Sequence, residues 1–87
     1  MVYKVVLTKQ VAKDLRSLDQ EVAKRILRKL VWLGKQSNPL FHAKRLRESA
    51  AGDVRFRIGD YRAIALINNK QKRIEIVQIG HRREIYL

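Results

Sequence analysis

The chain contains no cysteine, only one proline and no long run of apolar residues. Without cysteine, neither a disulfide framework nor a cysteine-ligated zinc site can stabilise the fold, so core packing must suffice. The first residues, MVYKVVLTK, have too short an apolar run for a signal peptide. No stretch reaches the roughly 20 apolar residues that a membrane span needs. We therefore expect a cytoplasmic protein without a membrane partner.

Acidic residues are also scarce, since 8 Asp and Glu stand against 20 Lys and Arg, for a formal net charge of +12 over 87 residues. The excess is not a tail, because residues 1–40 and residues 41–87 each contribute half of it. One domain spanning residues 1–87 is expected at this length. A surface this basic indicates nucleic acid or an acidic protein as a partner, with improved solubility as the alternative explanation.

The first third of the chain predicts a strand followed by two helices. Residues 2–7 are β-branched or aromatic, as in a strand, and Thr8 can cap a helix that begins at Lys9. Asp19 can cap a second helix, and Gly34 is placed to end it. The short connection between the helices predicts an antiparallel hairpin packed on a sheet. The expected apolar faces consist of Val11, Leu15 and Leu18 in the first helix and Val22, Ala23, Ile26, Leu27, Leu30 and Leu33 in the second.

The rest of the chain predicts three strands joined by hairpins, over residues 53–58, 61–67 and 72–80. Residues 35–52 are the least periodic part, and we expect a loop with a short helical turn around Lys44 to Glu48. The predicted fold class is α+β in the order β-α-α-β-β-β, with the hairpin packed on a mainly antiparallel four-stranded sheet. The middle strand of the three hairpin-linked strands has apolar residues on both faces and should be central. Which face of the last strand is buried stays open.

Most catalytic signatures are missing from the sequence, since there is no GxSxG, HExxH, P-loop or GxGxxG motif. The two histidines have no companions at ligand spacing, and neither a metal nor a cofactor is expected. What remains is a set of arginines on the predicted strands and the segment after them, with Tyr61, His81 and Tyr86 near them in sequence. This arginine set consists of Arg55, Arg57, Arg62, Arg73, Arg82 and Arg83.

Arginine presents a planar fork of donors that matches phosphate oxygens, so a row of arginines on strands can hold an RNA backbone. RNA cleavage needs little more, because the 2′-OH of the RNA can attack the adjacent phosphate. The protein must hold the RNA in line, stabilise charge at phosphorus and supply a proton to the leaving 5′ oxygen. Imidazole exchanges protons near neutral pH, which makes His81 a candidate for this transfer. The hypothesis requires Arg55, Arg57, Arg62 and the His81–Arg82 pair to converge.

Each candidate residue also has a structural explanation. Arg55 and Arg57 can form the solvated face of a strand, and Arg62 can pair with Asp60 or Glu84. An exposed His81 can be without function, and Tyr86 can either stack on a base or close the core. For His42, in the loop, we prefer no functional role.

The runs RFRIGDYRAIALI and IEIVQIGHRREIY, with KRLRES before them, resemble the RelE/ParE superfamily of type II toxin–antitoxin toxins, and more closely its RelE branch. The resemblance implies a toxin that cuts messenger RNA in the ribosomal A site without a metal or cofactor. By motif position it implies roles for Arg55, Arg57, Arg62, Arg82 and Tyr86. We predict catalytic roles for Arg62, His81, Arg82 and Tyr86, and RNA binding by Lys44, Arg55, Arg57 and Arg83. Because arginine is a poor proton shuttle, Arg55 and Arg57 would position and neutralise the RNA rather than act as bases. The general acid stays open between His81 and Arg82.

The resemblance further implies that a small acidic antitoxin holds the toxin inactive by wrapping its basic surface. Two alternatives stay open beside the ribosome-dependent endoribonuclease. One is a ParE-like toxin that inhibits DNA gyrase without RNA chemistry. The other is a non-catalytic relative that only binds nucleic acid, with an affinity that falls steeply with salt.

Overall fold

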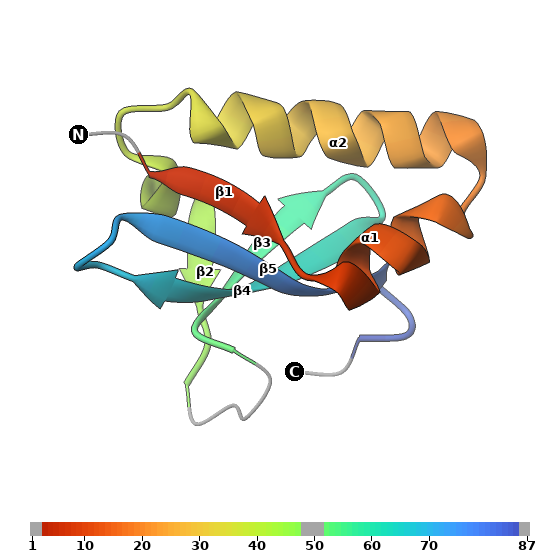
Figure 1. Cartoon of the computed structure of the whole chain (residues 1–87). Coiled ribbons are helices and arrows are strands. Elements are labelled where there is room, and N and C mark those ends of the chain that lie inside the picture. Colours follow the sequence, from red (N-terminus) through yellow and green to blue (C-terminus); the bar gives the residue numbers. More distant parts are fainter. Residues whose placement is uncertain (1–2, 48–51, 86–87) are drawn as a thin grey trace.

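The computed structural model describes residues 3–47 and 52–85, and within them the chain forms helices on one side of a mixed sheet (Figure 1). The elements follow the chain in this order: β1 (Lys4–Leu7), α1 (Lys9–Arg16), α2 (Gln20–Gly34), the 3-10 helix η1 (Pro39–His42), β2 (Ala43–Arg45), β3 (Val54–Ile58), β4 (Tyr61–Asn68) and β5 (Arg73–His81).

The sheet has the strand order β1-β5-β4-β3-β2. Strands β2 to β5 pair in antiparallel fashion, whereas β1 runs parallel to β5. A parallel neighbour requires a crossover connection, and here the helices are part of the long connection between the two strands. The interior strands are β5, β4 and β3, and β4 is central, as expected from its two apolar faces.

Both helices begin where the sequence predicts, at side-chain caps. The Thr8 hydroxyl accepts a hydrogen bond from the backbone N–H of Val11 at 3.1 Å. The Asp19 carboxylate accepts from the N–H groups of Glu21 and Val22, at 3.0 and 3.4 Å. Each cap satisfies donors that the first turn of a helix leaves without a partner. α1 ends at Arg16, so it is shorter than the apolar pattern indicates, which extends to Leu18.

The hydrophobic core lies between the helices and the sheet. Its largest fully buried side chains include Ile26 and Leu33 of α2, Phe56 of β3, and Ile74 and Ile76 of β5. The expected stripe on α2 is only partly buried, since Leu27 is 41% exposed. Leu27 instead borders a hollow between the two helices, so placing it in the core was wrong.

A bulge in the pairing of β4 with β5 decides which face of β5 is buried. Ala65 of β4 pairs with Ile76 of β5, but Ala63 pairs with Ile79, so β5 has one extra residue in this interval. The alternation of β5 changes phase at this point. Ile79 therefore joins Ile76 in the core, whereas Gln78 is exposed on the other face.

The predicted sheet lacked one strand. Residues 43–45 form β2, which pairs with β3 at the edge of the sheet, so the sheet has five strands rather than four. Lys44 lies in this strand and not in a helical turn. The short helix occurs earlier, at η1, where Pro39 begins it. Among the described residues, no helix has the length and apolarity required to cross a membrane.

Candidate nucleic-acid interface

The sheet face that points away from the helices carries the predicted arginines. Arg57 of β3 lies directly opposite Arg62 of β4, and Arg62 lies opposite Gly80 of β5. Lys44 of β2 lies opposite Arg55 of β3. Because alternate residues of a strand point to opposite faces, these cationic side chains share the face opposite to buried Phe56 and Ile58. We call the set Lys44, Arg55, Arg57, Arg62 and Arg82 the arginine face.

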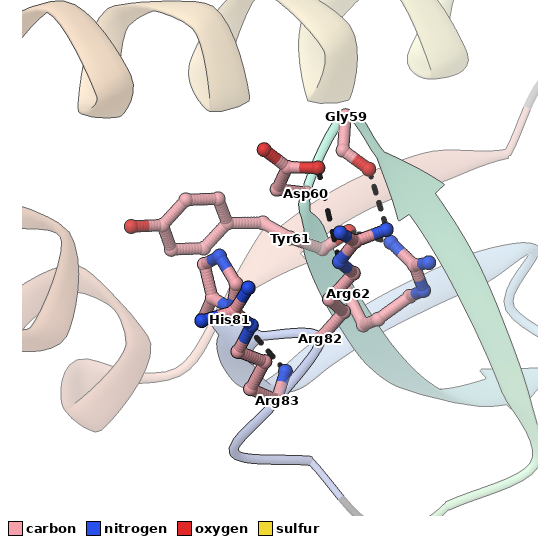
Figure 2. A network of polar contacts seen from close by, with 7 residues as sticks. All are labelled: Gly59, Asp60, Tyr61, Arg62, His81, Arg82 and Arg83. Atoms are coloured by element: carbon pink, nitrogen blue, oxygen red, sulfur yellow. Dashed lines mark hydrogen bonds and ion pairs between the residues drawn. The ribbon is translucent and has the colours of Figure 1, made fainter.

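Arg62 is the fixed member of this set. Its Nη1 donates to the carbonyl oxygens of Gly59 and Tyr61, at 3.0 and 2.9 Å (Figure 2). Gly59 begins the β3–β4 turn with a φ of 60°, a conformation that glycine adopts without strain. The turn thus provides the backbone carbonyl that orients the Arg62 guanidinium.

The pKa of Arg62 reports a crowded cationic site. Burial lowers this pKa first, and the positive charges of Arg57, Arg55 and Arg82 lower it further, whereas Asp60 raises it. A guanidinium nevertheless remains protonated in proteins. Arg62 therefore stays a cation among cations, and an anionic ligand would relieve the repulsion.

Arg82 reaches the arginine face from the residues that follow β5. Its backbone N–H donates to the Asp60 carbonyl at 2.8 Å, and its Nε lies 3.9 Å from Asp60 Oδ1 (Figure 2). Both side chains of this ion pair are more than half exposed, so the pair contributes little stability. In the described part of the chain, Arg55, Arg57 and Arg62 have no carboxylate oxygen within 4.0 Å. The expected alternative of an Arg62 pair with Asp60 or Glu84 is thus not observed.

His81 does not point toward the arginine face. It pairs across the strands with Tyr61, and the two rings meet edge to face with centroids 5.4 Å apart (Figure 2). Tyr61 packs against the core on the helix side of the sheet. The Nδ1 atom of His81 accepts a hydrogen bond from the backbone N–H of Arg83 at 3.2 Å, so the neutral ring carries its proton on Nε2. The Arg83 side chain is exposed, and Tyr86 lies outside the described residues.

Two glycines that sequence reasoning did not assign to the site shape this face of the sheet. A Cβ on Gly80 would lie 2.9 Å from Cγ1 of Ile85, and one on Gly52 would lie 2.6 Å from Cγ2 of Ile64. Ile85 and Ile64 are buried outside the main core. The chain after β5 therefore folds back onto Gly80, beside Arg62. A glycine within a strand pattern is the sequence signal for such a close approach.

No group of three His, Asp or Glu side chains suited to a metal ion occurs within residues 3–47 and 52–85. The described surface does provide a dense array of guanidinium groups, of which that of Arg62 is held by two backbone carbonyls. Such an array can bind phosphate oxygens by charge and by paired hydrogen bonds.

Comparison with known proteins places the chain among toxins. A family profile described as the ParE toxin of the type II toxin–antitoxin system parDE matches residues 5–86. A search of curated proteins gave no match.

Several solved structures share the fold of this chain, and three of them illustrate the likeness. The chain superimposes with a TM-score of 0.81 on a chain of the RelBE2 toxin–antitoxin complex of Mycobacterium tuberculosis, at 26% identity over 93% of this chain and 99% of that one. A chain of the archaeal RelE–RelB complex of Pyrococcus horikoshii is 33% identical over 98% of this chain and 100% of that one, with a TM-score of 0.74. A variant of E. coli RelE in the free state shares the fold at 18% identity, over 93% and 84% of the chains, with a TM-score of 0.66. The chain is a member of the RelE/ParE superfamily of type II toxin–antitoxin toxins.

Proposed function

We propose that this toxin is a ribosome-dependent endoribonuclease that cuts messenger RNA, and that the arginine face binds the RNA. The observation that carries the proposal is the repulsion stored around Arg62. Arg62 lies directly opposite Arg57 across the strands, and the charges of Arg57, Arg55 and Arg82 all act on its guanidinium. Arg82 has one weak, exposed carboxylate contact. A phosphodiester bound beside Arg62 would neutralise the positive charges of Arg57 and Arg62, which have no carboxylate oxygen within 4.0 Å among the described residues.

The proposed division of roles follows from position. Arg55, Arg57 and Lys44 form the adjacent rows of the same face and would hold the RNA backbone on either side of the cut. Arg62 and Arg82 would stabilise the additional negative charge that develops at phosphorus as the 2′-OH attacks. Arg62 is prepared for this by two backbone carbonyls, which reduces the reorganisation that binding costs.

Protonation of the leaving 5′ oxygen is the step with two candidates. Arg82 lies on the arginine face, whereas His81 must turn its imidazole away from Tyr61 and release the Arg83 N–H to reach it. We assign proton transfer to His81 only if this rotation occurs on RNA binding. If a His81→Ala variant retains full cleavage, another residue protonates the leaving 5′ oxygen. Tyr86 is the remaining candidate that the family resemblance implies.

Inhibition of DNA gyrase is the second candidate function, and the match to the ParE family profile favours it. The two functions differ in what they need from the arginine face, because only RNA cleavage requires phosphate chemistry there. Purified toxin should be incubated in parallel with ribosomes programmed with a defined messenger RNA and with gyrase and relaxed plasmid.

We expect messenger RNA to be cleaved and supercoiling to be unaffected. Arg62→Ala and Arg82→Ala should abolish cleavage while the far-ultraviolet circular dichroism stays unchanged. Arg25→Ala, which removes an exposed arginine from α2, is the matched control and should cleave normally. Intact messenger RNA together with inhibited supercoiling would replace the nuclease by the gyrase inhibitor. Normal cleavage by both arginine variants would show that the site is misplaced.

We further propose an acidic antitoxin as the protein partner. The M. tuberculosis structure is a toxin–antitoxin complex, and the P. horikoshii structure is a complex of RelE with RelB. In this chain, a hollow of about 530 Å³ between α1 and α2 is lined mainly by apolar side chains, with Arg16 at its border. An amphipathic helix with acidic flanks matches both the apolar lining and the basic surroundings.

A further inference from the structure

A second cluster of exposed side chains lies where α2 ends and η1 begins, away from the arginine face. The rings of Trp32 and His42 meet edge to face with centroids 4.7 Å apart, and the rings of Phe41 and His42 do so at 5.5 Å. Phe41 is 81% exposed and Trp32 is 39% exposed. Large aromatic side chains are costly to leave in water, so an exposed cluster of them marks a contact surface.

The charge around this aromatic cluster has one sign in the sequence. From residue 28 to residue 42, where α2 ends and η1 follows, the chain has no Asp or Glu but has three Lys and Arg. One of them, Lys29, places its Nζ 4.0 Å from the centroid of the Trp32 ring, as in a cation–π contact. The surface therefore combines an aromatic ring with cations, which is the combination that binds single-stranded nucleic acid.

The shape of the cluster favours a base over an apolar helix as its ligand. An apolar helix needs a groove, such as the one between α1 and α2, whereas Phe41 projects into solvent from a single turn of 3-10 helix. The backbone N–H of Phe41 donates to the Asn38 carbonyl at 3.1 Å, which fixes the base of the side chain. His42 contacts the Phe41 ring edge to face, and Trp32 in turn contacts His42, so most of the exposed Phe41 ring can receive a flat partner.

We propose that Phe41, supported by His42 and Trp32, is a stacking platform for an unpaired RNA base, with neighbouring Lys and Arg residues binding the adjoining phosphates. This site is separate from the arginine face, since α2 covers the opposite side of the sheet (Figure 1). The inference concerns RNA binding alone and does not require cleavage. If the proposed function holds, ribosomal RNA is the natural source of such a base.

The test uses a short oligouridine carrying 2′-O-methyl groups, which cannot supply an attacking 2′-OH, and measures its binding to the full chain by fluorescence anisotropy. Phe41→Ala should weaken binding by roughly 5- to 150-fold, the range for loss of one stacked base. Phe41→Tyr should bind as the unchanged chain does. The salt dependence of binding should be the same in all three, because no phosphate contact is removed.

Val31→Ala is the matched control, since Val31 is also apolar, lies on α2 and is 57% exposed. It should bind RNA normally. Trp32 is the single tryptophan of the chain, so quenching of its emission by the oligonucleotide provides a local readout. Emission that RNA does not change, or equal affinity for Phe41→Ala and the unchanged chain, would overturn the inference.

Phe41→Leu separates stacking from general apolar contact. If Phe41→Leu binds RNA as tightly as Phe41→Tyr, the platform is wrong. If poly-glutamate binds with the same dependence on Phe41 as RNA, the surface is a protein contact and the inference is also wrong. Failure of the nuclease proposal is distinguishable, because messenger RNA would then stay intact on ribosomes, whereas the Phe41-dependent ratio of affinities for the oligonucleotide would persist.

Discussion

Replacement of Arg57 by glutamine should stabilise the fold while it weakens RNA cleavage. Arg57 and Arg62 are direct cross-strand partners, so their Cβ atoms lie about 5 Å apart. Like charges directly opposite each other on neighbouring strands destabilise a sheet by about 0.2–1 kcal/mol. Arg55 and Arg82 add to the repulsion felt by Arg62. We therefore expect Arg57→Gln to raise the free energy of unfolding by about 0.5–1 kcal/mol.

Thermal unfolding followed by circular dichroism measures this gain. For a domain of this size it corresponds to a rise in Tm of about 2–8 °C. The rise should shrink as salt is added, because the Debye length falls to about 8 Å at physiological ionic strength and to about 3 Å at 1 M. Arg25→Gln is the matched control, since it lowers the net charge equally from an exposed position on α2. A Tm for Arg57→Gln equal to or below that of Arg25→Gln would refute the stored repulsion.

Three further predictions concern other elements. Gly80→Ala should destabilise the chain by about 1–3 kcal/mol, because the new Cβ would overpack against Ile85. It should also reduce cleavage, because Ile85 would be displaced from beside Arg62. Unchanged urea unfolding and unchanged cleavage would contradict this. Thr8→Ala should cost about 0.5–2 kcal/mol in the same unfolding assay by removing the acceptor for Val11, with Thr8→Ser as the conservative control. Leu27→Glu should weaken binding of the cognate antitoxin in calorimetry without lowering Tm, and unaltered affinity would place the antitoxin elsewhere.

The strands and helices with strong local signals were predictable from the sequence. Thr8 and Asp19 lie at the helix starts as capping residues, and the Gly59–Asp60 turn lies between two alternating strands. These features depend on neighbours in the chain and therefore leave a mark in it. β2 depends instead on pairing with β3, and three residues are too few to show alternation. The local sequence of residues 43–45 therefore indicates a loop and not a strand.

The candidate site was predictable only in part, because its geometry depends on strand register. The alternation of β3 is enough to place Arg55 and Arg57 together on one face. That Arg62 lies opposite Arg57 follows only from the length of the β3–β4 turn. The same alternation places His81 on the face opposite to Gly80 and Arg82, so the predicted convergence of His81 with Arg82 was wrong. The bulge in β5 has no comparable local signal, so the buried face of that strand required the structure.

The chemistry of the RNA ends tests the central claim most directly. Messenger RNA cut on ribosomes by the purified toxin should carry a 2′,3′-cyclic phosphate on the upstream fragment and a 5′-OH on the downstream fragment. Arg62→Ala should yield neither product. Fragments that end in a free 3′-OH, or cleavage that Arg62→Ala leaves intact, would contradict attack by the 2′-OH on a phosphate held by the arginine face.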